Sequence, residues 1–234
     1  EKKACGKGIE LQGKTLGIVG FGRIGQHLGV MAKAIGMTVI AFDIFHIPGI
    51  EEQLGIPYVE MDELLAKSDF ISVHAPAVDG GALINAERIA KMKDGVCIIN
   101  TSRGTNVDEA ALLAALESGK VAAYVSDFAS DEILAQENAV TLPHLGASTP
   151  ESEDNCAKMA VYEITEYLEK GTIRNSVNFP NLKVPYEGGY RVCLIHKNIP
   201  NMIASITSAV HTNIENMGNR SRGDYAYTII DLAD

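Results

Sequence analysis

The sequence predicts an α/β fold with a doubly wound parallel sheet, and three observations lead to this prediction. Short apolar runs alternate with helical patterns between residues 15 and 142. Three glycines follow the first run at the spacing G-x-G-x-x-G, and polar residues collect where the runs end. Strands that alternate with helices form a parallel sheet covered on both faces, with functional residues beyond the carboxyl ends of the strands.

The first predicted elements form a strand–helix–strand unit. The apolar run at residues 16–19 is short enough for one buried strand. The helix after it repeats apolar residues at three- and four-residue steps before a closing glycine; these positions are Ile24, Leu28, Met31, Ile35 and Gly36. A second apolar run at residues 38–42 predicts a strand that ends at Asp43.

Each glycine of the motif has a physical role. Gly20 permits the tight turn off the strand, Gly22 lets a diphosphate approach the backbone, and Gly25 lets the helix lie close to the sheet. The N–H groups and the positive dipole end at the helix start hold phosphates. Asp43 lies 18 residues after Gly25, where an acid hydrogen-bonds a ribose hydroxyl and repels a 2′-phosphate. The unit therefore predicts a dinucleotide site that favours NAD over NADP.

The alternation continues through four more predicted strands, at residues 70–74, 96–100, 121–125 and 139–142. Three further helices are predicted: a short one that runs through Lys67 before the strand at residues 70–74, one at residues 86–92 and one at residues 109–118. Side chains that can accept from free N–H groups stand at their starts, and Asp62, Asn85 and Asp108 are the predicted N-caps.

Polar residues gather at five of the predicted strand ends. The residues at these ends, polar ones together with their immediate neighbours, are Asp43, His74, Ala75, Pro76, Asn100, Thr101, Ser102, Arg103, Gly104, Ser126, Asp127, Pro143 and His144. Any one of these is more simply explained as a solvated loop residue, but five groups on one edge indicate a functional site. Residues 143–149 have little of the polarity typical of loops, which indicates that His144 is placed there for a purpose.

The remainder of the chain predicts a long helix and a new pattern. The helix starts after a cap at Ser148 or Thr149 and runs to about residue 170, and residues 175–180 are extended. A linker with proline and glycine leads to a β-α-β-β pattern, with elements at residues 190–196, 202–211, 214–217 and 225–232. We expect domains at residues 1–150, 151–186 and 187–234.

The composition excludes several classes of function. The 234 residues are 46% hydrophobic and 21% charged, with a formal net charge of −10, which argues against binding to nucleic acid or to an anionic membrane. The four cysteines, Cys5, Cys97, Cys156 and Cys193, lie far apart, which fits a reducing compartment and no metal site. With no signal peptide or membrane span in the sequence, we expect a cytoplasmic protein.

Four motifs identify a family resemblance: GKTLGIVGFGRIG, INTSRG, LPHLGAST and NSVNFP. Residues from about 11 to 180 resemble the D-2-hydroxyacid dehydrogenases, and the tail looks like an ACT domain, a small regulatory module. The resemblance implies a Rossmann-like NAD domain followed by a partial ferredoxin-like α+β domain. It also implies NAD as cofactor, a phosphorylated 2-hydroxy acid as substrate, an amino-acid effector at the tail and a homodimer through the NAD domain.

The resemblance also implies residue roles. Arg103 would bind the substrate carboxylate, His144 would exchange a proton with the substrate hydroxyl, and Asp127 would meet the nicotinamide carboxamide. The implied cofactor-binding residues are Gly20, Gly22, Arg23, Ile24, Gly25, Asp43, Ala75, Pro76, Thr101, Ser102, Asp127, Gly146 and Ala147.

One departure from the family concerns the catalytic glutamate. The family places it five residues after the position of Asp127, which points to Glu132, but the proline that usually follows is absent and the interval to His144 is short. Glu132 is then either the catalytic partner of His144 or a surface residue at a helix start, and the shortened interval favours the second. In that case His144 works without an acidic partner or borrows one.

Two further departures affect activity and assembly. The family carries a substrate-domain stretch of roughly 100 residues before the dinucleotide strand, so we expect this chain alone to bind NAD but to turn over poorly. The ACT-like tail lacks its usual second helix and last strand, so we expect an exposed sheet edge and an exposed apolar face.

Two other functions remain open. Another D-2-hydroxy acid, such as glycerate or lactate, could be the substrate, although the ACT-like tail argues against this. A non-catalytic NAD-sensing protein, like the transcriptional corepressors that resemble these dehydrogenases, is the second alternative.

Overall fold

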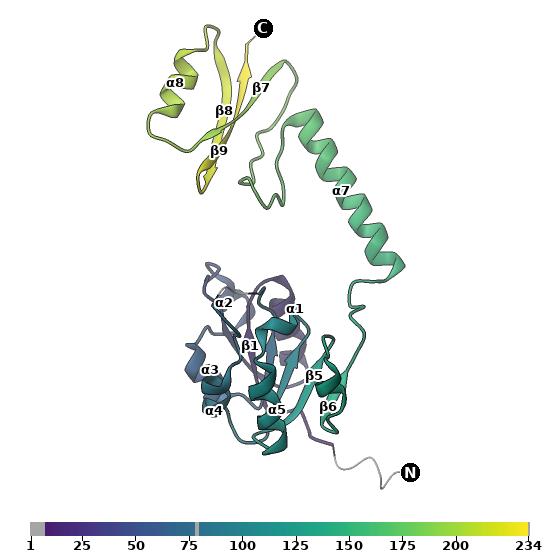
Figure 1. The fold of residues 1–234 in the computed structure, drawn as a ribbon. Helices are drawn as coiled ribbons and strands as arrows, with labels where there is room; N and C mark the ends of the chain where they lie inside the picture. The colour runs from purple at the N-terminus through teal and green to yellow at the C-terminus, as the bar shows by residue number, and fades with distance from the viewer. Residues whose placement is uncertain (1–7, 78–79, 234) are drawn as a thin grey trace. The chain divides into compact units, whose positions relative to one another are not determined.

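The computed structural model describes residues 8–77 and 80–233, so Cys5 lies outside the described part. The chain divides into two compact units, one ending at His144 and one beginning at Leu145. Each unit is described by itself below (Figure 1). The division into three domains that the sequence predicts stays a prediction.

The first unit is built on a six-stranded parallel sheet, as the sequence predicts. Its strands are β1 (Thr15–Val19), β2 (Thr38–Phe42), β3 (Phe70–Val73), β4 (Val96–Asn100), β5 (Val121–Ser126) and β6 (Ala139–Thr141). They lie in the order β2-β1-β3-β4-β5-β6, and every neighbouring pair is parallel. All the carboxyl ends therefore meet at one edge.

The helices of this unit agree with the predicted ones and add short elements. They are α1 (Arg23–Ala34), α2 (Ile50–Leu54), α3 (Met61–Lys67), α4 (Ala86–Lys91), the 3₁₀ turn η1 (Gly104–Asn106), α5 (Glu109–Glu117) and α6 (Asp131–Leu134). The side chains of Asn85 and Asp108 accept the N–H groups of Arg88 and Ala111, which confirms both predicted caps.

The predicted cap at Asp62 is wrong. The helix begins one residue earlier, at Met61, because this side chain is buried in the core and fixes the first turn. Glu60 is the residue at the N-cap position, with no side-chain bond, and the Asp62 carboxylate instead pairs with Lys91 at 3.0 Å.

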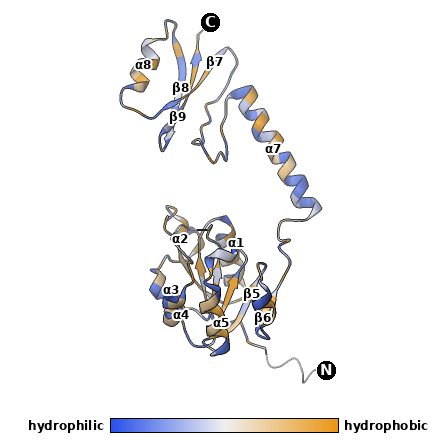
Figure 2. Cartoon of the chain, viewed as in Figure 1, coloured by the Kyte–Doolittle hydropathy of each residue, from blue (hydrophilic) through white to orange (hydrophobic). Residues whose placement is uncertain are grey.

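The core lies on both faces of the sheet, and alternate residues of one strand serve opposite faces. Leu16 and Ile18 pack in a cluster with Ala32 of α1, whereas Val19 belongs to a second cluster with Leu64 of α3. The second cluster continues across the sheet to α4 and α5. Figure 2 shows hydrophobic colour concentrated in these strands. The sheet is thus covered on both sides, as a doubly wound fold requires.

Helix α1 turns a face of small residues toward the sheet. Gly25, Gly29 and Ala32 are its buried residues, whereas Ile24 and Met31 are 70% and 61% exposed. The apolar repeat therefore predicted the helix correctly, but of its members only Leu28 packs against the core, whereas Ile24, Met31 and Ile35 lie on the outer side. Small residues on the inner side let the helix axis approach β1 closely, which sets the position of the helix start.

Gly20 is the tightest position of the first turn. Its φ is +94°, and an added Cβ would lie 2.6 Å from the Ala75 nitrogen and 2.7 Å from the His74 carbonyl carbon. Both neighbours are backbone atoms at the end of β3 and cannot move aside, so an alanine here meets both a strained φ and a clash.

We therefore expect Gly20→Ala to lower the free energy of unfolding by about 3 kcal/mol in urea titrations followed by circular dichroism. The control is Gly13→Ala, which has a similar φ of +78° but nothing within 4 Å among the described residues. It should cost only about 1 kcal/mol. Equal losses of unfolding free energy in the two variants would show that the close approach of Gly20 to β3 adds nothing to the cost of the substitution.

The second unit contains α7 (Pro150–Lys170), β7 (Tyr190–Lys197), α8 (Met202–Ser208), β8 (Ile214–Arg222) and β9 (Tyr225–Leu232). Thr149 caps α7 through the Ser152 N–H, and Gly171 ends it in the left-handed conformation, as predicted. The sheet order is β7-β9-β8, and both pairs are antiparallel. Strands β7 and β8 are thus parallel to each other with β9 between them, a split β-α-β arrangement.

This small sheet leaves apolar side chains uncovered, as expected. Tyr190 and Ile195 of β7 are 68% and 48% exposed. Helix α8 ends at Ser208, earlier than the predicted residue 211, and it buries none of its residues. Within residues 8–77 and 80–233, no helix is long and apolar enough to cross a membrane.

Candidate active site

The strand ends gather the predicted site residues at one edge of the parallel sheet. Strand β1 lies between β2 and β3 in the sheet. The connection from β1 to β2 and the connection from β2 to β3 therefore run over opposite faces. Ligands of open α/β sheets bind at such a point, beyond the carboxyl ends of the strands. The loops after β1, β2, β3, β4, β5 and β6 therefore define the candidate site.

The loop after β1 and the acid after β2 are joined directly. The Asp43 carboxylate accepts the N–H of Phe21 at 2.7 Å through one oxygen and the N–H of Phe45 at 3.0 Å through the other. Among the described residues nothing lies within 4 Å of a Cβ built on Gly22. The turn thus presents open space at the start of α1, where helix N–H groups lack partners within the helix.

A buried network of amides and hydroxyls holds the loop after β4. The Asn100 side chain is fully buried; it donates to the Arg103 carbonyl at 2.9 Å and accepts from the Ser102 hydroxyl at 2.7 Å. The Asn106 amide donates to that hydroxyl at 3.0 Å and to the Ala75 carbonyl at 2.8 Å. The ends of β3 and β4 are thereby tied together beneath Arg103.

Arg103 itself points outward from this fixed loop. Its side chain is exposed, and its guanidinium donates to the Ser102 carbonyl at 2.6 Å. The backbone is constrained while most of the guanidinium fork faces solvent. This arrangement suits an arginine that receives a ligand carboxylate.

His74, at the end of β3, differs from a proton-transfer histidine. Its Nε2 lies 2.8 Å from the Ser72 hydroxyl, and burial lowers the pKa of its imidazole. A histidine that burial keeps neutral serves as a packed polar residue more readily than as a base that cycles its charge.

His144 follows β6 and pairs with the residue that follows β5. Its Nδ1 lies 2.7 Å from Oδ2 of Asp127, and the ring of Phe128 packs against the imidazole with centroids 4.5 Å apart. The His144 side chain is 54% exposed, whereas that of Asp127 is 10% exposed. The other carboxylate oxygen, Oδ1, is buried and finds no hydrogen-bond donor among the described residues.

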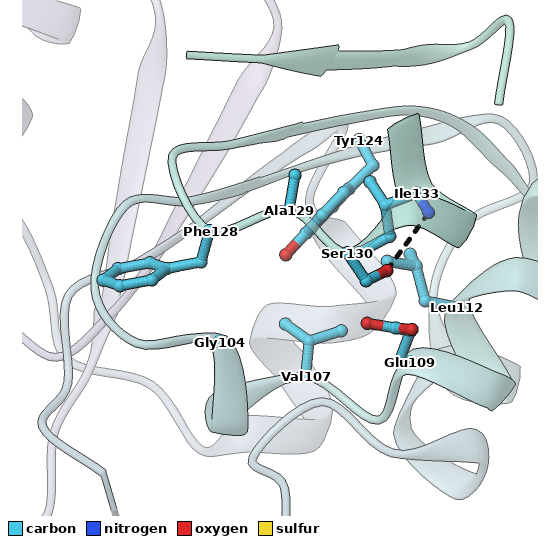
Figure 3. A pocket seen from close by; sticks show the side chains of 9 residues that line it. All are labelled: Gly104, Val107, Glu109, Leu112, Tyr124, Phe128, Ala129, Ser130 and Ile133. Atoms are coloured by element: carbon cyan, nitrogen blue, oxygen red, sulfur yellow. Dashed lines mark hydrogen bonds between the residues drawn. The ribbon is translucent and has the colours of Figure 1, made fainter. Parts of the chain in front are cut away.

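Glu132 does not reach His144. It lies exposed in the first turn of α6, a helix that Ser130 caps through the N–H of Ile133. Ile133 is buried and lines a pocket of about 270 Å³ together with Leu112 and Tyr124. Figure 3 shows Phe128 at one end of this pocket and Ile133 at the other. Because Ile133 faces the pocket, the adjacent Glu132 faces solvent.

The other predicted positions divide between the two units. Pro76 and Thr101 are exposed at the edge of the parallel sheet, and Arg23 and Ile24 are exposed at the start of α1. Gly146 and Ala147 fall in the second unit, so their place beside the nicotinamide ring stays a prediction.

Sequence reasoning missed Asn106 and Phe128. Asn106 acts on Ala75, 31 residues away, so no local pattern marks it. Phe128 directly follows Asp127 at a strand end, and an aromatic residue next to a predicted site residue was a signal that could have been used.

The comparisons with known proteins agree with this geometry. Residues 1–148 match the family model of the D-isomer specific 2-hydroxyacid dehydrogenase NAD-binding domain. D-3-phosphoglycerate dehydrogenase 1 of Saccharomyces cerevisiae is 32% identical over 99% of this chain and 54% of its own length. Hydroxypyruvate reductase of Blautia hydrogenotrophica is 44% identical over 73% of this chain and 55% of its own.

A solved glyoxylate reductase from Paecilomyes thermophila is 38% identical, with a TM-score of 0.67 over 73% of this chain and 54% of that one. The chain thus spans about half the length of the relatives it matches. The family match covers more than half of the 234 residues. The chain therefore belongs to the D-isomer specific 2-hydroxyacid dehydrogenases, a family of NAD-dependent oxidoreductases, and residues 1–148 match its NAD-binding domain.

Proposed function

We propose that the protein oxidises 3-phospho-D-glycerate to 3-phosphohydroxypyruvate with NAD, as a D-3-phosphoglycerate dehydrogenase. The share of the chain that the similarity covers supports this proposal most strongly. The phosphoglycerate dehydrogenase of Saccharomyces cerevisiae matches 99% of the chain, the small antiparallel sheet included, whereas the hydroxypyruvate reductase matches 73%.

His144 supplies the base in this proposal. The Asp127 carboxylate accepts a hydrogen bond from Nδ1, so a neutral ring keeps its hydrogen there and Nε2 keeps its lone pair. Nε2 takes the hydroxyl proton as the C–H bond of the substrate carbon breaks, and the C–O bond becomes a carbonyl. NAD, when bound, would supply the acceptor for the hydride that leaves that carbon. Arg103 holds the substrate carboxylate with two charge-assisted hydrogen bonds.

The residues present fit NAD at both ends of the sheet edge. Gly22 leaves space for the diphosphate at the start of α1, and Asp43 lies beside it at the end of β2, where a ribose hydroxyl would bind. At the other end of that edge, Oδ1 of Asp127 is a buried acceptor with no donor among the described residues, and such an acceptor costs about 1–3 kcal/mol. The nicotinamide carboxamide would supply that donor to Oδ1 of Asp127.

The direct test is a comparison of substrates by NADH absorbance in a protein that joins this chain to the substrate-domain stretch of the family, because the chain spans about half the length of the relatives it matches. We expect kcat/KM for 3-phospho-D-glycerate to exceed that for D-glycerate and D-lactate at least tenfold, and the same order for 3-phosphohydroxypyruvate over hydroxypyruvate in the reverse direction. Turnover of none of these, with NADH binding intact by calorimetry, would contradict the proposal and favour a non-catalytic NAD sensor.

A second candidate is the reduction of hydroxypyruvate or glyoxylate. The higher identity of the matched reductases, 44% and 38%, favours it, although both matches stop short of the full chain. A preference for the unphosphorylated substrates in the same assay would select this function.

The tail and the assembly also belong to the proposal. We take the β7-α8-β8-β9 unit as the first part of an ACT-like module that binds an amino-acid effector, and the NAD domain as the contact of a homodimer. The split β-α-β order supports the first point. The apolar outer face of α1 supports the second.

A further inference from the structure

We propose that Asp127 is the acidic partner of His144, in the place that the family gives to a glutamate. This inference rests on the proposed function and adds a positioning role to a residue otherwise expected only to meet the nicotinamide. The contact that carries it is the 2.7 Å distance from Nδ1 of His144 to Oδ2 of Asp127.

The path of the chain explains why Asp127 takes this role. The Ser126 hydroxyl donates to the Asn100 carbonyl at 2.9 Å and accepts the N–H of Phe128 at 3.0 Å, which fixes the turn directly after β5. Asp127 lies between these two anchored residues at the end of a sheet strand. A carboxylate held this way orients an imidazole better than one on a mobile loop.

Glu132 is excluded from the same role by its helix. Ser130 caps α6 and Ile133 packs into the pocket beside Tyr124, which together fix the rotation of this short helix (Figure 3). Glu132 is consequently directed to solvent, and its backbone carbonyl accepts the Gln136 side chain at 3.3 Å. The short segment between β5 and β6 therefore offers His144 the carboxylate of Asp127 and not that of Glu132.

One carboxylate would thus serve two groups. Oδ2 orients the imidazole, and the buried Oδ1, which has no donor in the described part of the chain, is left to accept from the nicotinamide carboxamide. The same side chain would then couple the position of the base to the position of the ring that receives the hydride. This coupling makes the geometry of the base sensitive to bound NAD.

The test is Asp127→Asn, with Asp131→Asn as the matched control and Glu132→Gln as the competing variant. We expect Asp127→Asn to lower kcat at saturating NAD and substrate at least about a hundredfold, because an amide no longer stabilises the imidazolium. Both other variants should stay within about twofold of the parent.

Two measurements separate this inference from the proposed function. The C2–H resonance of His144, assigned by its loss in His144→Gln, should change its chemical shift at a fixed pH in Asp127→Asn and stay unchanged in Glu132→Gln, whatever the substrate of the enzyme. In the His144→Gln background, Asp127→Asn should cost little further kcat. A larger effect of Glu132→Gln than of Asp127→Asn on this chemical shift or on kcat would overturn the inference.

Discussion

Replacing His144 with glutamine is expected to lower kcat/KM about a thousandfold while leaving the fold intact. Glutamine can still donate a hydrogen bond to the Asp127 carboxylate, but it cannot take the hydroxyl proton, and general base catalysis contributes about 10²- to 10⁴-fold. The side chain is 54% exposed, so its loss creates no cavity in the core. Steady-state kinetics with 3-phospho-D-glycerate and NAD measure the effect.

The control is His211→Gln, an exposed histidine in the second unit, which should keep the parental rate. NADH affinity by calorimetry should also stay within about threefold for His144→Gln, because the imidazole acts on the substrate. A fall in kcat/KM of less than tenfold would mean that the proton goes to another group.

Substitution of Arg103 is expected to cause the second large loss of kcat/KM, in the variants Arg103→Lys and Arg103→Gln. Lysine keeps the positive charge but loses the planar fork, so we expect kcat/KM to fall about a hundredfold in Arg103→Lys and further in Arg103→Gln. The loop itself should be unaffected, because the buried side chains of Asn100 and Asn106 hold it through other atoms.

The division between kcat and KM distinguishes binding from catalysis. If Arg103 also polarises the reacting carbon–oxygen bond, both constants worsen; if it only binds the carboxylate, KM alone rises. Arg220→Lys, an exposed change on β8, serves as the control. Unchanged kinetics in Arg103→Gln would place the carboxylate site elsewhere.

Local physical rules explain which parts of the fold the sequence predicts. Most strands of the parallel sheet are largely buried and read as continuous apolar runs, so the predicted bounds agree with the structure to within one residue. The caps at Asn85 and Asp108 involve partners three residues away, so they too were predictable. The helical repeat of α1 identified the helix but not its buried face, because that face consists of Gly25, Gly29 and Ala32.

The candidate site was predictable as a set of strand ends but not as a set of contacts. The pairing of His144 with Asp127 joins residues 17 positions apart, across the path of β6 and α6. Sequence spacing pointed only to Glu132 and left any borrowed partner unnamed, whereas the structure places Oδ2 of Asp127 2.7 Å from Nδ1 of His144. The short helix α2 also escaped prediction because it is little more than a single turn set by tertiary packing.

The position of β9 between β7 and β8 has a consequence for synthesis. Both outer strands precede β9 in the sequence and bond only to it within their sheet. On the ribosome, β7 and β8 therefore emerge without a hydrogen-bonding neighbour and stay open to chaperones or to other nascent chains until Tyr225–Leu232 follows. The NAD domain faces no such delay, since β1 has β2 and β3 as neighbours early in translation.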